Sequence, residues 1–431
     1  MNESLDQKIR LRNAVARAHT QAASGQISKM MVKEAPVYSG RALQLLPIVL
    51  VNLVLTLLTA GIYRFWAKTR LRRYFLSRVS FLGDALEYTG TGMELFRGFL
   101  IALAALVPFF IVTSILQNFL VSPDAAIGPV AAFQLAYLFA IYFLYHVAVF
   151  RAQRYRLSRT TWRGIRGGQQ GSAMLYALYA IGLGLLTLVT LGLAYPVMRR
   201  VLMGYRINAI RFGSETVRMD GGFAPLMRAW LLPWLLMFLA VLPLAFTLWV
   251  DGPEVLTDQS GETQRFQFGK IRFGVLVPIG AAGWLIANFW YRAAELRHFA
   301  GGTRFEDLKF ESRLGGHHLF LPYLLYGIVI VLTIAGALIA AVTLAAGYSL
   351  KATGPAVPSE METYLGLAII VVGTILLASF KPVIVQNWIF RNLCRTLTIQ
   401  GSFSPDRLFQ NQFAIPNRGE GLADALDVDA F

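Results

Sequence analysis

Residues 63–74 read Tyr63-Arg64-Phe65-Trp66-Ala67-Lys68-Thr69-Arg70-Leu71-Arg72-Arg73-Tyr74, with five basic residues and no acid directly after a long apolar run. Similar basic runs begin at Phe150 and at Tyr291, each again at the end of an apolar stretch. Basic residues beside apolar spans mark the cytoplasmic side of membrane proteins. The pattern therefore predicts a membrane protein, and also the side of the membrane on which these runs lie.

The composition of the 431-residue chain is that of a protein embedded in lipid. Hydrophobic residues make up 56% and charged residues 15%, which leaves too little polar surface to cover a water-soluble domain. The net charge of +16 would favour nucleic acid only if the basic residues shared one soluble face. Because they stand at the ends of apolar segments, we expect no nucleic-acid partner, and instead a bilayer with anionic headgroups.

The single cysteine, Cys394, excludes an intrachain disulfide and argues against a thiolate metal site. Nothing else in the sequence indicates a cofactor, and we expect none. Residues 1–36 contain no continuous apolar core and no small-residue cleavage site, so they do not resemble a signal peptide. We expect a basic cytoplasmic arm, either an amphipathic helix on the membrane surface or a loosely ordered tail.

Eight apolar stretches run through the chain, at residues 43–63, 98–120, 129–150, 173–197, 229–250, 273–294, 319–348 and 363–386. Most reach the roughly 20 residues that a helix needs to cross a bilayer. Most of the arginine lies in the connectors 64–97, 151–172, 198–228, 295–318 and in the tail after 386. Each of these connectors opens as a basic helical extension and continues into a short strand-like stretch with glycine. The fold class predicted is an all-α polytopic membrane protein with strand-like pieces in its cytoplasmic loops.

A shift of 131 residues lays Leu55-Thr-Leu-Leu-Thr-Ala-Gly61 over Leu186-Thr-Leu-Val-Thr-Leu-Gly192 without a gap, and pairs Tyr74 with Tyr205. We interpret this as a unit of three apolar segments that occurs twice, followed by a copy without the first segment, in the order A-B-C, A-B-C, B-C. The predicted divisions are an arm 1–36, repeats at 37–168 and 169–312, a partial repeat at 313–410 and a tail 411–431.

The repeat conflicts with a model in which every segment crosses the membrane, because the loops after A and after C are basic in both copies. We therefore favour A segments that enter and leave on the cytoplasmic side, broken near Gly61 and Gly192, with six full crossings in three hairpins. Length favours the alternative of eight crossings, since residues 43–63 as a helix are about 31 Å long. The sequence thus predicts six to eight transmembrane helices.

Ionisable residues inside the apolar stretches are candidates for function, and they are few. His146 is one, as a proton relay or a solute ligand, although a hydrogen bond to a neighbouring helix is the more ordinary role. No Asp or Glu lies deep in a stretch, and no catalytic set or metal-ligand spacing stands out. We expect a protein that is not an enzyme.

The breaks at Gly61 and Gly192 are the second candidate, because broken helices expose backbone groups to a bound solute. Arg64, Lys68, Arg199 and Arg200 would line the cytoplasmic approach to them, in a basic vestibule for an anionic solute or headgroup. The alternative is purely topological: the arginines fix orientation and extend to phospholipid headgroups.

The run Leu55-Thr-Leu-Leu-Thr-Ala-Gly-Ile-Tyr-Arg-Phe-Trp-Ala-Lys, followed by Glu87-Tyr-Thr-Gly-Thr-Gly-Met-Glu-Leu-Phe-Arg-Gly-Phe, resembles the YjgN-like proteins. Trp162-Arg-Gly-Ile-Arg matches the pattern further along, while Ala60 stands where the family has Leu. The resemblance covers about residues 37–410. It implies a multi-pass protein of the bacterial inner membrane, and it brings no substrate, cofactor or catalytic residue.

Two functions follow as hypotheses. The first is a transport or channel protein for an anionic or amphiphilic solute, which would enclose a polar cavity. The second is a membrane protein that does not transport and binds lipid headgroups or a partner through its basic cytoplasmic face, which would have a packed centre. An enzyme acting on lipid comes third, because no acid–base set supports it.

Overall fold

The computed structural model describes residues 30–120, 127–250, 253–257, 263–268, 275–349, 373, 377 and 379–403. Most of the predicted N-terminal arm, most of the eighth apolar stretch and the predicted C-terminal tail lie outside the described residues.

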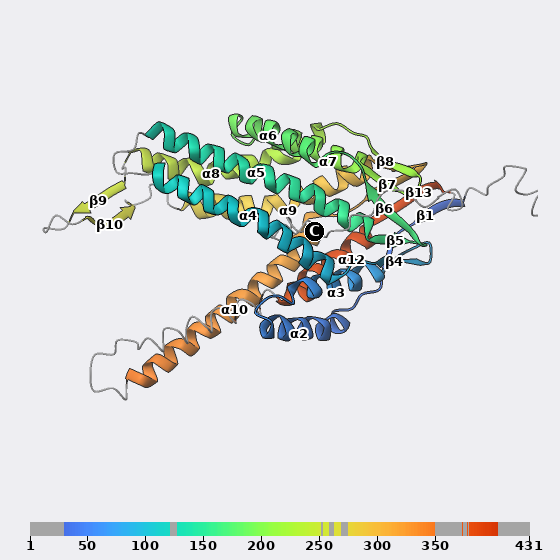
Figure 1. Ribbon diagram of the computed structural model, residues 1–431, viewed down its shortest axis with the longest axis horizontal. Coiled ribbons are helices and arrows are strands. Elements are labelled where there is room, and N and C mark those ends of the chain that lie inside the picture. The colour runs from blue at the N-terminus through green and yellow to red at the C-terminus, as the bar shows by residue number, and fades with distance from the viewer. Residues whose placement is uncertain are drawn as a thin grey trace, which may run out of the picture.

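Eleven short strands form one antiparallel sheet at one end of the molecule (Figure 1). The strands are β1 (Met30–Glu34), β2 (Val37–Tyr38), β3 (Val79–Phe81), β4 (Asp84–Tyr88), β5 (Thr160–Trp162), β6 (Ile165–Gln169), β7 (Ile210–Phe212), β8 (Glu215–Met219), β11 (Thr303–Phe305), β12 (Leu308–Ser312) and β13 (Leu397–Phe403). Their order in the sheet is β1-β13-β12-β11-β8-β7-β6-β5-β4-β3-β2. The prediction of an all-α fold was too narrow, since the strand-like pieces of separate loops pair with one another.

The sheet is rolled, because β1 and β2 lie at its two ends and yet are separated in the chain only by Ala35 and Pro36. Tight turns join neighbouring strands at the edge away from the helices. In two of them, Leu82-Gly83 and Arg163-Gly164, both central residues have positive φ, as the two-residue turns of twisted hairpins require.

Five aromatic rings at strand ends fill the inside of the rolled sheet, and Phe310 of β12 packs against the same cluster. Each of the five comes from the last residue of its strand: Phe81, Trp162, Phe212, Phe305 and Phe403. Trp162 lies 5.9 Å from the Phe81 ring and 6.1 Å from that of Phe403, between ring centroids. The Phe305 ring is 6.1 Å from Phe212 and 6.2 Å from Phe403. Because strands far apart in sequence contribute to one aromatic cluster, burial of these rings holds the sheet closed.

The helices all extend from the opposite edge of the sheet (Figure 1). They are α2 (Ala42–Leu58), α3 (Arg64–Ser77), α4 (Gly92–Leu120), α5 (Ile127–Ser158), α6 (Ala173–Val189), α7 (Tyr195–Asn208), α8 (Ala224–Val250), α9 (Leu276–Gly302), α10 (Gly316–Ser349), the π-helix η1 (Pro382–Gln386) and α12 (Asn387–Thr396). The long helices α4 and α5 connect β4 to β5, and the long helices α8 and α9 connect β8 to β11. A small hairpin of β9 (Pro253–Thr257) and β10 (Thr263–Phe268) joins α8 to α9. Each helical excursion thus returns to the sheet.

Two short helical hairpins, α2–α3 and α6–α7, start and end at the sheet. The Tyr74 hydroxyl accepts a hydrogen bond from the Arg41 amide (3.0 Å) and donates one to the Arg41 carbonyl (2.9 Å), which fixes the end of α3 beside the start of α2. Tyr205 makes the same two bonds to Ser172, at 3.0 and 3.1 Å. The chain therefore reverses at the turns after α2 and α6, where the sequence predicted breaks.

The two short hairpins correspond closely. Helix α6 begins at Ala173, 131 residues after the start of α2 at Ala42, and α7, β7 and β8 follow α3, β3 and β4 at the same interval. The turns correspond as well, since Gly61 and Gly192 have φ angles of 90° and 88°. Each glycine follows a residue with φ near 50°, so the two chains reverse through the same backbone conformation.

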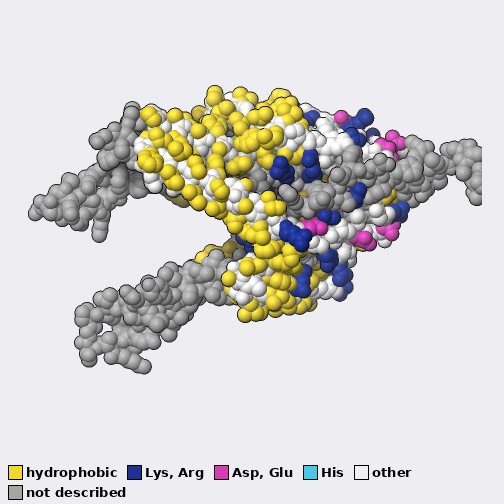
Figure 2. Space-filling model, in the orientation of Figure 1, with side chains coloured by type: hydrophobic (Ala, Val, Ile, Leu, Met, Phe, Trp, Pro, Cys, Tyr) yellow, Lys and Arg dark blue, Asp and Glu magenta, His cyan; other side chains and the backbone are white. Residues whose placement is uncertain are grey.

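Within the described residues, four helices are long and apolar enough to cross a membrane: Gly92–Leu120, Gly128–Ser158, Ala224–Phe246 and Gly316–Gly336. Helices α2 and α6 are apolar but have only 17 residues each. Apolar side chains cover the outside of the helical part (Figure 2). Such surfaces belong in lipid rather than water, which indicates a membrane protein. The larger number of crossings stays a prediction.

Candidate functional site: the basic layer between the helices and the sheet

Basic side chains gather where the apolar helices end and the sheet begins (Figure 2). They come from α3, α7, the first two turns of α4 and α8, and the sheet-side ends of α5, α9 and α12. The basic layer, as we name it, comprises Lys68, Arg70, Arg72, Arg73, Arg97, Arg151, Arg154, Arg156, Arg159, Arg199, Arg200, Arg206, Arg228, Arg292, Arg297, Arg391 and Arg395. Charges at this level of a membrane protein would face phospholipid headgroups.

Glu295 ties two arginines of the layer together. Its side chain is 3% exposed, and its Oε2 accepts a 2.9 Å bond from Arg292, one turn earlier on α9. Its Oε1 accepts a bond from Nε of Arg199 on α7. The structure therefore places Arg199 in a buried ion pair between α7 and α9, where its guanidinium is already occupied.

A second acid neutralises the layer where α4 begins. The Tyr155 hydroxyl donates a 2.7 Å hydrogen bond to Oε2 of Glu94, and Arg159 pairs with Oε1 of the same carboxylate at 3.0 Å. Tyr155 is almost fully buried and packs against Phe65 and Leu95. This contact joins the start of α4 to the end of α5.

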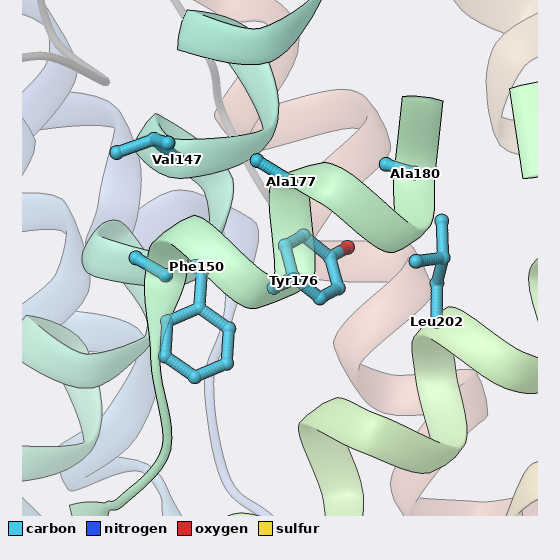
Figure 3. Packing of buried hydrophobic residues seen from close by; sticks show 7 residues of the cluster. Val147, Phe150, Tyr176, Ala177, Ala180 and Leu202 are labelled. Carbon is cyan, nitrogen blue, oxygen red and sulfur yellow. The ribbon is translucent and has the colours of Figure 1, made fainter. Parts of the chain in front are cut away.

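His146 of α5 contacts Tyr176, a member of the packed cluster of α5, α6 and α7 that Figure 3 shows from close by. The imidazole is 8% exposed, and its ring centroid lies 4.6 Å from that of Tyr142 and 5.7 Å from that of Tyr176. Within the described part of the chain, its Nδ1 has no hydrogen-bond partner. The imidazole ring therefore packs against tyrosines of α5 and α6.

The other predicted site residues are distributed over two hairpins. The Arg64 guanidinium lies over the rings of Phe65 and Phe99, 4.9 and 5.0 Å from their centroids. Lys68 is partly buried one turn further along α3. On α7, Nε of Arg200 donates a 2.6 Å hydrogen bond to the Gly221 carbonyl. The structure thus keeps Arg64 and Lys68 on one hairpin, and Arg199 and Arg200 on the other.

The two predicted breaks differ in what surrounds them. At the second, the carbonyl of Gly192 accepts a 2.9 Å hydrogen bond from the Trp230 indole, and the Leu191 carbonyl accepts one of the same length from Trp234. The corresponding positions beside Gly61, 131 residues earlier, are Phe99 and Leu103, which have no donor. Helix α8 therefore fixes the second turn through two hydrogen bonds that the first turn lacks.

Sequence reasoning did not single out a groove between α2 and α3 that combines apolar and basic walls. It has a volume of about 520 Å³ and is lined by Pro47, Ile48, Val51, Arg70, Arg73, Tyr74 and Ser77. The basic run was the signal in the sequence. It could not show which of its arginines face the groove, because that depends on how α3 packs against α2.

Titratable groups elsewhere near the layer offer no metal site. No group of three or more His, Cys, Asp or Glu that could hold a metal ion occurs within the described ranges. Burial, and then the charge of Arg200, lower the pKa of His298 at the sheet end of α9. The neighbouring rings of His317 and His318 lie 4.0 Å apart, and Nδ1 of His318 accepts a 2.9 Å hydrogen bond from the Gly315 amide.

Comparison with known proteins identifies the family and goes no further. No curated protein and no solved structure matches the chain. The model of the DUF898 family, described as a bacterial protein of unknown function, matches residues 34–425. This match covers most of the chain and confirms the resemblance to the YjgN-like proteins that the sequence motifs indicated. The chain belongs to the DUF898 family.

Proposed function

We propose that the protein is a multi-pass protein of the bacterial inner membrane that binds anionic phospholipid headgroups through its basic layer. The sheet and the N-terminus would lie in the cytoplasm, on the side to which the positive-inside rule assigns the arginines. The observation that carries the proposal is the position of the layer, between the apolar helices and the polar sheet (Figure 2). An anionic leaflet contributes about 1 kcal/mol of attraction for each such residue.

Transport of an anionic or amphiphilic solute is the second candidate. The breaks after α2 and α6 favour it, because broken helices within an apolar layer are where transporters place their sites. Three features argue against transport, because each fills space or occupies a polar group that a solute would need. They are the aromatic rings inside the sheet, the buried pair of Arg199 with Glu295, and the turn at Gly192 that Trp230 binds. These contacts favour a binding role over transport.

The tandem organisation belongs to the same proposal. The common interval of 131 residues between the elements of the two short hairpins supports related units at 37–168 and 169–312. The last long excursion, from β12 to β13, would be the partial unit at 313–410. Both short hairpins would enter the membrane from the cytoplasm and return to it.

The test compares the thermal unfolding of the protein in nanodiscs of phosphatidylcholine with that in nanodiscs that also contain phosphatidylglycerol. Ligands that bind the folded state raise the unfolding temperature, so we expect a higher value with the anionic lipid. Salt screens exposed charges, so the difference should shrink at about 1 M salt. Equal values in both lipids would contradict the proposal. Flux of an anionic solute into proteoliposomes above the protein-free background would support transport instead.

A further inference from the structure

We infer that the groove between α2 and α3 is a site for one anionic phospholipid, with the phosphate on Arg70 and Arg73 and an acyl chain along α2. This inference rests on the proposed function. It assigns one phospholipid to a defined groove, where the proposed function requires only a general attraction of headgroups to the basic layer. It goes beyond the sequence candidates, because neither arginine was among them.

The two arginines are placed to bind a phosphate together. They are three residues apart on α3, so their side chains leave the same face of the helix at the groove. The Arg70 guanidinium lies 5.6 Å from the centroid of the Tyr63 ring, and Arg73 makes one long bond of 3.5 Å to the Gly90 carbonyl. Neither pairs with a carboxylate among the residues that the structure describes. Their planar donor groups match phosphate oxygens.

The apolar wall of the groove continues as a stripe suited to an acyl chain. Pro47 and Val51 line the groove, and Val54 and Leu58 follow on the same face of α2 at helical spacing. Val51, Val54 and Leu58 are 47%, 53% and 77% exposed. The stripe leads from the arginines towards the turn at Gly61 and away from the sheet. A lipid with its phosphate at the basic layer would extend its chain in this direction.

The second hairpin provides an internal comparison. At the positions 131 residues after Arg70 and Arg73 it has Val201 and Gly204, on a helix with the same bounds relative to its neighbours. Its Tyr205 makes the same hydrogen bonds as Tyr74. Arg200 covers Gly204, since a Cβ built there would lie 2.5 Å from its Nη1. The scaffold is therefore shared, and the two guanidinium groups that would hold a phosphate belong to the first hairpin alone.

The test uses native mass spectrometry of the full-length protein in detergent, titrated with dioleoyl phosphatidylglycerol or dioleoyl phosphatidylcholine. We expect one phosphatidylglycerol to bind more tightly than the rest. Arg70→Gln/Arg73→Gln should weaken that event roughly 25-fold, at about fivefold for each arginine near a membrane surface. The matched control is Arg218→Gln/Lys309→Gln, which removes two exposed positive charges of the sheet, outside the basic layer. It should leave the tight event unchanged.

The outcomes separate this inference from the proposed function. If the wild type does not prefer phosphatidylglycerol, the proposed function fails and the site with it. If it does, but both double variants weaken binding equally, the overall positive charge of the protein attracts the lipid and the site is wrong. Glycerophosphoglycerol, the headgroup without acyl chains, should not compete at equal concentration. Full competition would show that the groove binds a free anion and would overturn the lipid assignment. A thermal scan of each variant verifies that it is folded.

Discussion

Glu295 lies between Arg199 and Arg292, and its side chain is almost fully buried. A buried carboxylate is stable when guanidinium groups compensate it, and those groups in turn depend on the acid. The same dependence does not apply at the surface, where water screens the charges and an ion pair contributes at most about 1 kcal/mol. At the level of single residues, the buried pair is therefore the most sensitive point of the basic layer.

Glu295→Gln should destabilise the protein by about 3 kcal/mol, because it leaves Arg199 buried without its counter-charge. Chemical or thermal unfolding in detergent measures the change. The control is Glu311→Gln on β12, since Glu311 is exposed and accepts only a 3.2 Å hydrogen bond from Gln400. Equal stability of the Glu295 and Glu311 variants would show that the pair does not connect α7 to α9.

Cys394 should resist alkylation in the folded protein. Burial raises the pKa of its thiol to about 11, and only the thiolate reacts. At pH 8 about one thiol in a thousand would be ionised, and the fraction should rise as the pH approaches 11. Mass spectrometry after maleimide treatment measures the modification. The control is Arg218→Cys in a Cys394→Ser background, because position 218 is exposed; this cysteine should react within minutes. Rapid labelling of Cys394 in the native protein would show that its thiol is not buried.

At the level of elements, the two short hairpins share backbone bounds and differ in their surroundings. The turn at Gly192 is held by Trp230 and Trp234 of α8, whereas the turn at Gly61 has Phe99 and Leu103 in the corresponding positions. An amide group in an apolar environment costs free energy unless a donor satisfies it. The indole donors should therefore make the second turn more rigid than the first.

Trp234→Phe keeps an aromatic ring but removes the donor to the Leu191 carbonyl. We expect a loss of about 1 kcal/mol in unfolding free energy, and faster amide hydrogen exchange at residues 190–194. Trp290→Phe is the matched control, because the Trp290 indole makes no hydrogen bond within the described residues. If exchange in the turn is the same in both variants, the indole bond does not hold it.

At the level of the whole molecule, the arginine pattern predicted the membrane class, and the conflict between repeat and charge predicted that the chain reverses near Gly61 and Gly192. Local alternation predicted strand-like pieces in the basic loops. It could not predict the rolled sheet, because each loop contributes only a few apolar side chains, such as Trp162, to the shared core. The pairing of β1 with β13 cannot be predicted from local sequence either, because Val32 lies opposite Gly401, a residue near the other end of the chain.

The contacts of the candidate site residues could not be predicted from the sequence. Spacing in the sequence marked the arginines as a group, but it could not distinguish Arg199, which pairs with a buried acid, from Arg70 and Arg73, which line a groove. That distinction depends on which helix packs against which. The acid that binds Arg199 lies almost 100 residues away, at Glu295.

The central claim is that every helical excursion returns to one sheet, so all the tight turns of that sheet lie on one side of the membrane. A single measurement tests it: labelling of Arg163→Cys and Ser214→Cys, each in a Cys394→Ser background, with a membrane-impermeant maleimide. The short hairpin α6–α7 separates these two exposed positions. We expect both to react in inside-out vesicles and neither in intact spheroplasts. Labelling of the two positions from opposite sides would mean that residues 173–197 cross the membrane, and would contradict the account.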